Sequence, residues 1–127
     1  MGSIGKDYSV QEETSRIFQN EILNNALIPS LPPEIGEAGK LVQFTGNDRP
    51  SIPINWRFAE SVSSMKAFEA SMLNVLRARK YGSNFAEVKI NTDHASLFFM
   101  TPFLTQAVGK NGEIVEVDAF KPKVMDE

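Results

Sequence analysis

The residues best suited to chemistry are an adjacent aspartate and histidine, Asp93 and His94, and His94 is the only histidine in the chain. They follow an alternating apolar and polar segment that predicts a strand, so they stand at a strand-to-helix junction, where open α/β sheets bind ligands. There they could act as an acid and a base on a hydrophobic substrate. The alternative is that Thr92 or Asp93 caps the next helix and His94 donates to a backbone carbonyl.

Arg57 is the second candidate, because it follows an extended-looking segment, Ile52–Trp56, and could lie near His94 across neighbouring strands. A planar guanidinium suits phosphate, and the exposed amides at the start of the next helix would add to the attraction. This predicts an anion site at the strand ends. The alternative is an ordinary surface ion pair of Arg57 with Glu60 or Asp93.

Other kinds of site lack their signals. The chain contains no G-x-G-x-x-G, P-loop, G-x-S-x-G or H-E-x-x-H motif. A metal site is not expected, because His94 is joined only by the loosely placed Asp93 and Asp118. The apolar run Leu97–Met100 is typical of a core, but if it is exposed it indicates association with a partner.

Composition narrows the class of protein. The 127 residues predict one domain, and 42% hydrophobic residues suffice for a core. The net charge of −3 comes from 13 basic and 16 acidic residues, which are intermixed, so nucleic acid is not an expected partner. No apolar run is long enough to predict a membrane span. The absence of cysteine fits a reducing compartment, and we expect a cytoplasmic protein, with the peroxisome and mitochondrion as alternatives.

The N-terminal 40 residues predict a helix followed by an arm. Ser9 and Glu12 have capping-box spacing, and apolar residues then recur on one face to about residue 27, which predicts a helix over 9–27. Pro29, Pro32 and Pro33 cannot continue it and indicate an extended connector.

Residues 41–120 predict an α/β unit. Two segments before the central helix could be extended: Leu41–Phe44, as an edge strand, and residues 52–56. Helical spacing of apolar residues predicts a long helix over 59–81 that ends at Gly82. Apolar and polar residues alternate over 85–90, which predicts a strand. A helix from His94 to about Val108 follows, which Pro102 would kink or split near residues 99–101. The turn pair Asn111–Gly112 then leads into 114–117. Because parallel neighbours need a long connection, strand, helix and strand in this order favour a parallel βαβ unit with a right-handed crossover.

Several segments of the chain resemble the opening of fungal family III CoA-transferases (the CaiB/BaiF class), from about residue 8 to residue 120. The resemblance rests on Ile54–Ser61, Lys66–Ala70, Arg79–Gly82 and Ile90–Ala95. Relatives in this family include formyl-CoA and carnitine CoA-transferases and α-methylacyl-CoA racemase. The resemblance implies a Rossmann-like CoA-binding half, an interlocked dimer, and CoA or acyl-CoA as a substrate, with no covalently bound cofactor.

The resemblance also implies where CoA would be contacted. In bacterial members a V-Q-A-G-P loop after the first strand lies beside the thioester, and Phe58–Ser61 occupies the comparable place. Ala59 matches that loop, whereas its glutamine and glycine are missing here. The segment Ile90–Asp93 resembles the strand whose end approaches the adenosine. We therefore expect CoA contacts from Arg57, Ala59 and Asp93.

Length is the main departure from the family, because the family's catalytic aspartate lies well downstream of this region. This predicts a truncated N-terminal domain that transfers CoA between an acyl-CoA and a carboxylic acid only when a second chain completes the site, in fungal metabolite biosynthesis. One alternative is a non-catalytic remnant that binds CoA or a full-length paralogue, and a homodimer is a further possible assembly. Another is a small isomerase or accessory protein that uses His94 and Asp93.

Overall fold

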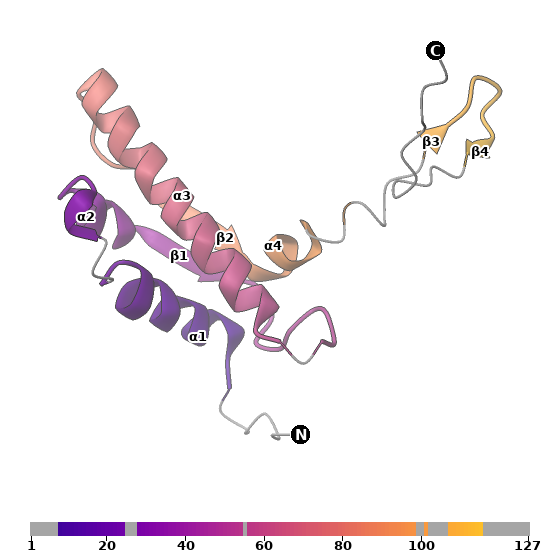
Figure 1. Ribbon diagram of the computed structural model, residues 1–127, viewed down its shortest axis with the longest axis horizontal. Helices are drawn as coiled ribbons and strands as arrows, with labels where there is room; N and C mark the ends of the chain where they lie inside the picture. The colour runs from indigo at the N-terminus through magenta and orange to yellow at the C-terminus, as the bar shows by residue number, and fades with distance from the viewer. Residues whose placement is uncertain (1–7, 25–27, 55, 99–100, 102–106, 116–127) are drawn as a thin grey trace, which may run out of the picture.

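The computed structural model describes residues 8–24, 28–54, 56–98, 101 and 107–115. Helical elements come first along these residues, and strands and helices then alternate up to a final pair of strands (Figure 1). The elements are α1 (Val10–Arg16), the π-helix η1 (Ile17–Ile22), the 3-10 helix η2 (Ile28–Ser30), α2 (Ile35–Gly39), β1 (Val42–Thr45), α3 (Phe58–Tyr81), β2 (Val88–Asn91), α4 (Thr92–Phe98), β3 (Ala107–Val108) and β4 (Ile114–Val115).

Strands β1 and β2 form a parallel pair, with Val42 opposite Val88 and Thr45 opposite Asn91. Helix α3 connects them, so the prediction of a parallel βαβ unit is confirmed. The predicted edge strand over 41–44 is confirmed as β1, whereas the prediction that residues 52–56 form the first strand of the unit was wrong. The backbone N–H of Ile54 instead donates to the Ile52 carbonyl at 2.8 Å, which closes a tight turn. Pro53 has no N–H to give to a ladder, which explains why this segment does not pair.

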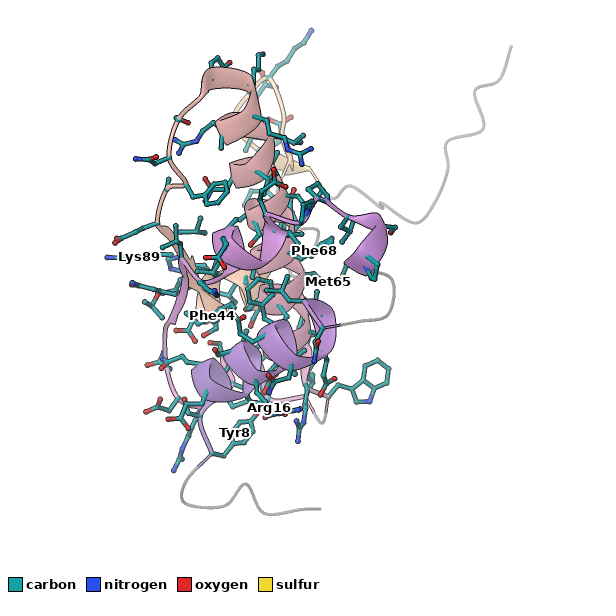
Figure 2. All side chains as sticks on the ribbon, turned by 90° about the vertical axis from the view of Figure 1, so that its left-hand side faces the viewer. Tyr8, Arg16, Phe44, Met65, Phe68 and Lys89 are labelled. Atoms are coloured by element: carbon teal, nitrogen blue, oxygen red, sulfur yellow. The ribbon has the colours of Figure 1, made fainter. Side chains whose placement is uncertain are left out.

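The helices cover one face of the β1–β2 pair. Figure 2 shows Phe44 on the side of the helices and Lys89 directed away from them. The alternation follows the strand period: Val42 and Ile90 are buried, whereas Lys89 and its partner Gln43 are exposed. The core consists of Phe18, Val42, Ala67 and Ile90, with Phe44 packed edge-to-face on Phe18 at a centroid distance of 6.0 Å.

Helix α3 confirms the predicted long helix and its glycine cap, since Gly82 adopts a left-handed φ of 63° and donates to the Ala78 carbonyl at 2.8 Å. Small side chains dominate the face that α3 buries. The buried residues are Ala59, Glu60, Ser63, Ser64, Ala67, Ser71, Asn74 and Val75. The Ser64 hydroxyl donates to the Thr14 carbonyl of α1 at 3.2 Å, and Asn74 makes two hydrogen bonds with the backbone of Ala86. Three of the bulky apolar positions that predict this helix, Met65, Leu73 and Leu76, are exposed.

The N-terminal segment begins as predicted and then differs. Ser9 caps α1 by accepting a hydrogen bond from the Glu12 N–H at 3.5 Å. The helical run ends at Ile22, after a π-helical turn in which the Leu23 N–H bonds to the Phe18 carbonyl, and residues 25–27 lie outside the described part. The prediction of an extended arm after this helix is wrong for the residues that the structure describes. It folds into η2 and α2, and the Arg79–Glu34 ion pair (2.7 Å) holds the start of α2 against α3.

The predicted helix from 94 to about 108, with a kink or split near 99–101, is described only in part, and its last residues form a strand instead. Helix α4 ends at Phe98, and Ala107–Val108 is a strand that pairs antiparallel with β4. The Asn111–Gly112 turn explains the hairpin, because Gly112 has a φ of 82° and its N–H bonds to the Gly109 carbonyl. Residues 99–100, 102–106 and 116–127 lie outside the described residues, and with them part of the predicted segment over 114–117.

Glu60 is a buried carboxyl group in the first turn of α3, with 1% of its surface exposed. The Tyr8 hydroxyl donates to its Oε1 atom, whereas Oε2 has no hydrogen-bond partner among the described residues. Burial raises the pKa of Glu60 above its ordinary value of 4.5, although a backbone hydrogen bond partly opposes this effect. The folded state therefore favours the neutral form of this group.

This predicts a pH-dependent gain in stability for Glu60→Gln. Because the pKa is raised in the folded state, stability falls as the pH rises from about 4.5 through the folded pKa, and the cost is complete above it. We expect Glu60→Gln to be more stable than the natural protein at pH 8 and to lose that advantage near pH 4. Denaturant unfolding across this range measures the difference. Glu87→Gln, at an exposed position, is the matched control, and parallel profiles for Glu60→Gln and the natural protein would contradict the prediction.

Candidate functional site

The carboxyl ends of β1 and β2 are joined by close contacts between the loop 46–51 and the start of α4. The Thr92 hydroxyl donates to the Thr45 carbonyl at 3.1 Å. Gly46 has a φ of 126°, and a Cβ at this position would lie 2.5 Å from the Thr92 Oγ1 atom. Only glycine fits such a close approach with this backbone conformation. The edge of the sheet where a ligand site was expected is therefore bridged by the protein's own loop.

Asp93 holds this loop in place. Its Oδ2 atom accepts hydrogen bonds from the backbone N–H of Asn47 at 2.9 Å and from the Asn47 side-chain amide at 3.0 Å, and the Ser51 hydroxyl donates to Oδ1. Burial alone would raise the pKa of Asp93, but the hydrogen bonds from Ser51 and Asn47 and the charge of His94 outweigh it, so that the pKa is lowered. Asp93 is thus an ionised acceptor with both oxygens engaged.

His94 lies in the first turn of α4 with an exposed side chain. Its backbone N–H donates to the Asn91 Oδ1 atom at 3.0 Å, so Asn91 caps the helix. The sequence offers Asn91, Thr92 and Asp93 as cap candidates, and Asn91 supplies the cap rather than Thr92 or Asp93. The hydrogen bonds of Asp93 lead to the loop and not to the imidazole, which gives no support to a hydrogen-bonded acid–base pair.

Arg57 stands at the N-cap of α3 and not at the end of a strand. Its guanidinium forms an ion pair with Glu13 of α1, a partner that neither alternative reading of the sequence included. Glu13 also binds Arg16 through two hydrogen bonds of 2.8 and 2.9 Å. The Arg57 side chain remains 60% exposed, and the neighbouring Trp56 is 81% exposed.

The first turn of α3 already contains a carboxyl group of the protein itself, Glu60. The Glu60 carboxyl accepts a hydrogen bond from its own backbone N–H, and Ala59 beside it is only 5% exposed. This carboxyl group therefore already bonds to one of the amides at the start of α3 that an external phosphate would need. Of the two parts of the anion site expected here, the exposed guanidinium of Arg57 is the one that stays accessible to an external phosphate.

Three residues that sequence reasoning did not single out, Gly46, Ser51 and Glu13, build this region with Asn47. A signal for part of it was present, since Thr45–Asp48 is rich in turn-forming residues directly after a strand. Among the described residues, no group of three or more His, Asp or Glu side chains is placed to hold a metal ion. No helix in the same part of the chain has the length and apolar character needed to cross a bilayer.

Comparison with known proteins gives the first functional observation. Over 108 residues the chain is 54% identical to the acetyl-coenzyme A transferase nodX of Hypoxylon pulicicidum. The chain is a homologue of a CoA-transferase. The matched residues are 85% of this chain but only 18% of nodX, so the chain spans less than a fifth of that relative. No family model matches the chain, and no solved structure matches it.

The close approach at Gly46 predicts a specific loss of stability. We expect Gly46→Ala to lower the free energy of unfolding by about 1–3 kcal/mol, because the new methyl group meets Thr92 and the residue must keep a positive φ. Gly36→Ala is the matched control, because nothing lies within 4 Å of a Cβ on this helical glycine. That change should instead raise stability by about 0.5–1 kcal/mol. Equal effects of the two substitutions in denaturant unfolding would argue against the bridged geometry.

Proposed function

We propose that this chain is part of a CoA-transferase of family III (the CaiB/BaiF class), which moves CoA between an acyl-CoA and a carboxylic acid. The observation that carries the proposal is the 54% identity to nodX over 108 residues. The parallel βαβ unit agrees with it, since a Rossmann-like fold contains such units. We further propose that residues 1–127 act as one domain, in the cytoplasm, and that the pathway is fungal metabolite biosynthesis.

On this proposal the nucleophilic carboxylate comes from another segment or another chain. Transfer through a carboxylate splits the reaction into two covalent steps, in which the carboxylate attacks the thioester carbonyl and CoA leaves as the thiolate. The carboxyl groups of Glu60 in α3 and Asp93 in α4 are poorly suited to this attack. Glu60 is 1% exposed, and both oxygens of Asp93 already accept hydrogen bonds.

The chain's own contribution would be to bind CoA. Arg57 is exposed enough to exchange Glu13 for a phosphate of CoA, and Trp56 beside it presents an aromatic surface on which adenine could stack. Ala59 is too buried to offer more than its backbone. Asp93 would act indirectly, because it fixes the loop 46–51 at the strand ends.

The exchange of ion pairs predicts opposite effects for two substitutions. Arg57→Ala should weaken CoA binding by about 10-fold, the loss of one charge-assisted contact, whereas Glu13→Gln should strengthen it because the competing carboxylate is gone. Calorimetric titration with CoA measures both. Arg79→Ala, which removes an equal charge that pairs with Glu34, is the control. If Arg57→Ala and Arg79→Ala had equal effects, Arg57 would not contact CoA.

An activity assay tests the larger proposal. The purified chain would be given acetyl-CoA and a panel of carboxylic acids, alone and together with a full-length homologue, and new acyl-CoA products would be measured by mass spectrometry. We expect no turnover by the chain alone. We expect the chain to bind CoA both alone and together with the homologue. Turnover by the chain alone would overturn the claim that the nucleophile comes from elsewhere, and the absence of CoA binding would overturn the CoA site.

A non-catalytic role is the second candidate, and the engaged state of Asp93 and the burial of Glu60 favour it. In that case the chain binds CoA, or binds a full-length paralogue, without completing an active site. The assay separates the two candidates, because only an incomplete transferase gains or changes activity when a second chain is added. The alternative of an isomerase based on His94 and Asp93 is not favoured, because the loop occupies the aspartate. His94→Ala would test it.

A further inference from the structure

Residues 8–13, which cap and begin α1, are bound to the loop 46–51. We call this segment the α1 strap. The backbone N–H of Val10 donates to the Asp48 carbonyl at 3.0 Å, and the side-chain amide of Gln11 donates to a second carbonyl of the loop. The strap therefore helps to hold the loop that bridges the two strand ends.

The other contacts of the strap lie at the start of α3. The Tyr8 hydroxyl donates to the Glu60 carboxyl group, and Glu13 forms its ion pair with Arg57. Figure 1 shows the start of α1 beside the start of α3, as these contacts require. The strap thus joins the loop at the strand ends to the guanidinium that is proposed to bind CoA.

With the strap in this position, buried polar atoms of α3 lack hydrogen bonds. Glu60, which Tyr8 contacts, is 1% exposed, and its Oε2 atom has no hydrogen-bond partner among the described residues. The hydroxyl of Ser63, one turn further along α3, is also buried and has no partner in the same part of the chain. Such atoms destabilise the state that buries them, because water would bond to them if they were exposed. Solvation of Glu60 therefore favours an open strap, whereas the contacts of the strap favour a closed one.

The ion pair between Glu13 and Arg57 can be exchanged without leaving Glu13 unpaired. The Glu13 carboxylate also accepts hydrogen bonds of 2.8 and 2.9 Å from Arg16, and these remain when Arg57 takes another partner. An anion on Arg57 would stand next to this carboxylate, which would repel it. An anionic ligand and the closed strap therefore exclude each other at Arg57.

We propose that the α1 strap opens and closes as one unit, and that its closed position keeps Arg57 from anionic ligands. The second part of this proposal rests on the proposed CoA contact of Arg57, whereas the first part does not. Because one short segment makes the contacts with both the loop and α3, the loss of a contact with either one loosens the other. The coupling is reciprocal: a ligand on Arg57 favours the open strap, and a change that opens the strap strengthens ligand binding.

Hydrogen exchange of the whole chain without CoA, followed by NMR, tests the strap itself. The Val10 amide reports opening, because it bonds to the loop in the closed position. We expect Arg57→Ala to raise the opening constant at Val10 by about 3–5-fold, the effect of losing one partly exposed ion pair. Since Arg57 lies outside α1, this change cannot act through the helix propensity of α1.

Two controls separate opening of the strap from fraying of α1. Glu12→Gln removes a charge from the same turn at an exposed position, so it measures the helix-dipole effect alone. After correction for that effect, Glu13→Gln should match Arg57→Ala, because both remove the same ion pair. The Asn47 amide, which bonds to Asp93 and not to the strap, should exchange at an unchanged rate.

Calorimetric titration with CoA tests the effect of the strap on Arg57. Gln11→Ala removes a contact with the loop and none with Arg57, and we expect it to tighten CoA binding by about 3–5-fold. Gln19→Ala, which removes a similar bond from a side-chain amide to the Gly39 carbonyl, is the matched control. Saturating CoA should also raise the opening constant at Val10, whereas pantetheine, which has no phosphate group, should not.

Each result decides one part of the proposal. Exchange at Val10 that neither Arg57→Ala nor Glu13→Gln changes would overturn the strap, whatever the result with CoA. A strap that opens as expected, in a chain whose CoA affinity Gln11→Ala leaves unchanged, would overturn its effect on Arg57. If no variant binds CoA, that effect fails together with the proposed CoA site, and exchange without CoA still decides whether the strap opens as one unit.

Discussion

The close packing of α3 against its neighbours is the constraint on which the rest of the structure depends. Ser63, Ser64, Ala67 and Ser71 give this helix a flat inner face, so that its backbone can approach α1, α2 and both strands. The serine hydroxyls would be costly to bury unpaired. Ser64 and Ser71 therefore donate to carbonyls of their own helix, at Glu60 and Ala67. Because small residues take up most of the inside, Met65, Leu73 and Leu76 remain outside.

Local signals explain how much of the fold could be predicted. The long helix, its Gly82 cap and the Ser9 cap of α1 follow from periodicity and capping chemistry, which act within a few residues. The choice between residues 42–45 and 52–56 as the first strand could not be predicted in this way, because both segments are short and neither carries a strong strand signal. The pairing of Val42 with Val88 shows that residues 42–45 form the strand. The sequence clue was Pro53, because a residue without an N–H cannot donate to the ladder of a central strand.

The candidate site was predictable in position but not in its contacts. Asp93 does lie at the carboxyl end of a parallel strand, as its place after an alternating segment indicated. Its partners, Asn47 and Ser51, stand 46 and 42 residues earlier, and no local pattern connects residues so far apart. The same holds for Arg57 and Glu13. Single-sequence reasoning thus places a charged group but does not tell whether another group neutralises it.

The length of α3 has a further consequence for how this chain reaches its folded state. The helix has 24 residues, about 36 Å, whereas each strand of the pair has four residues, about 13 Å. Every rung of the β1–β2 ladder therefore joins residues that are 46 positions apart, as Val42 and Val88 are. Such pairing must wait for a large loop to close, which is slow compared with helix formation. The formation of α3, which lies between the two strands in sequence, shortens that search, so we expect the helix to form before the strands pair.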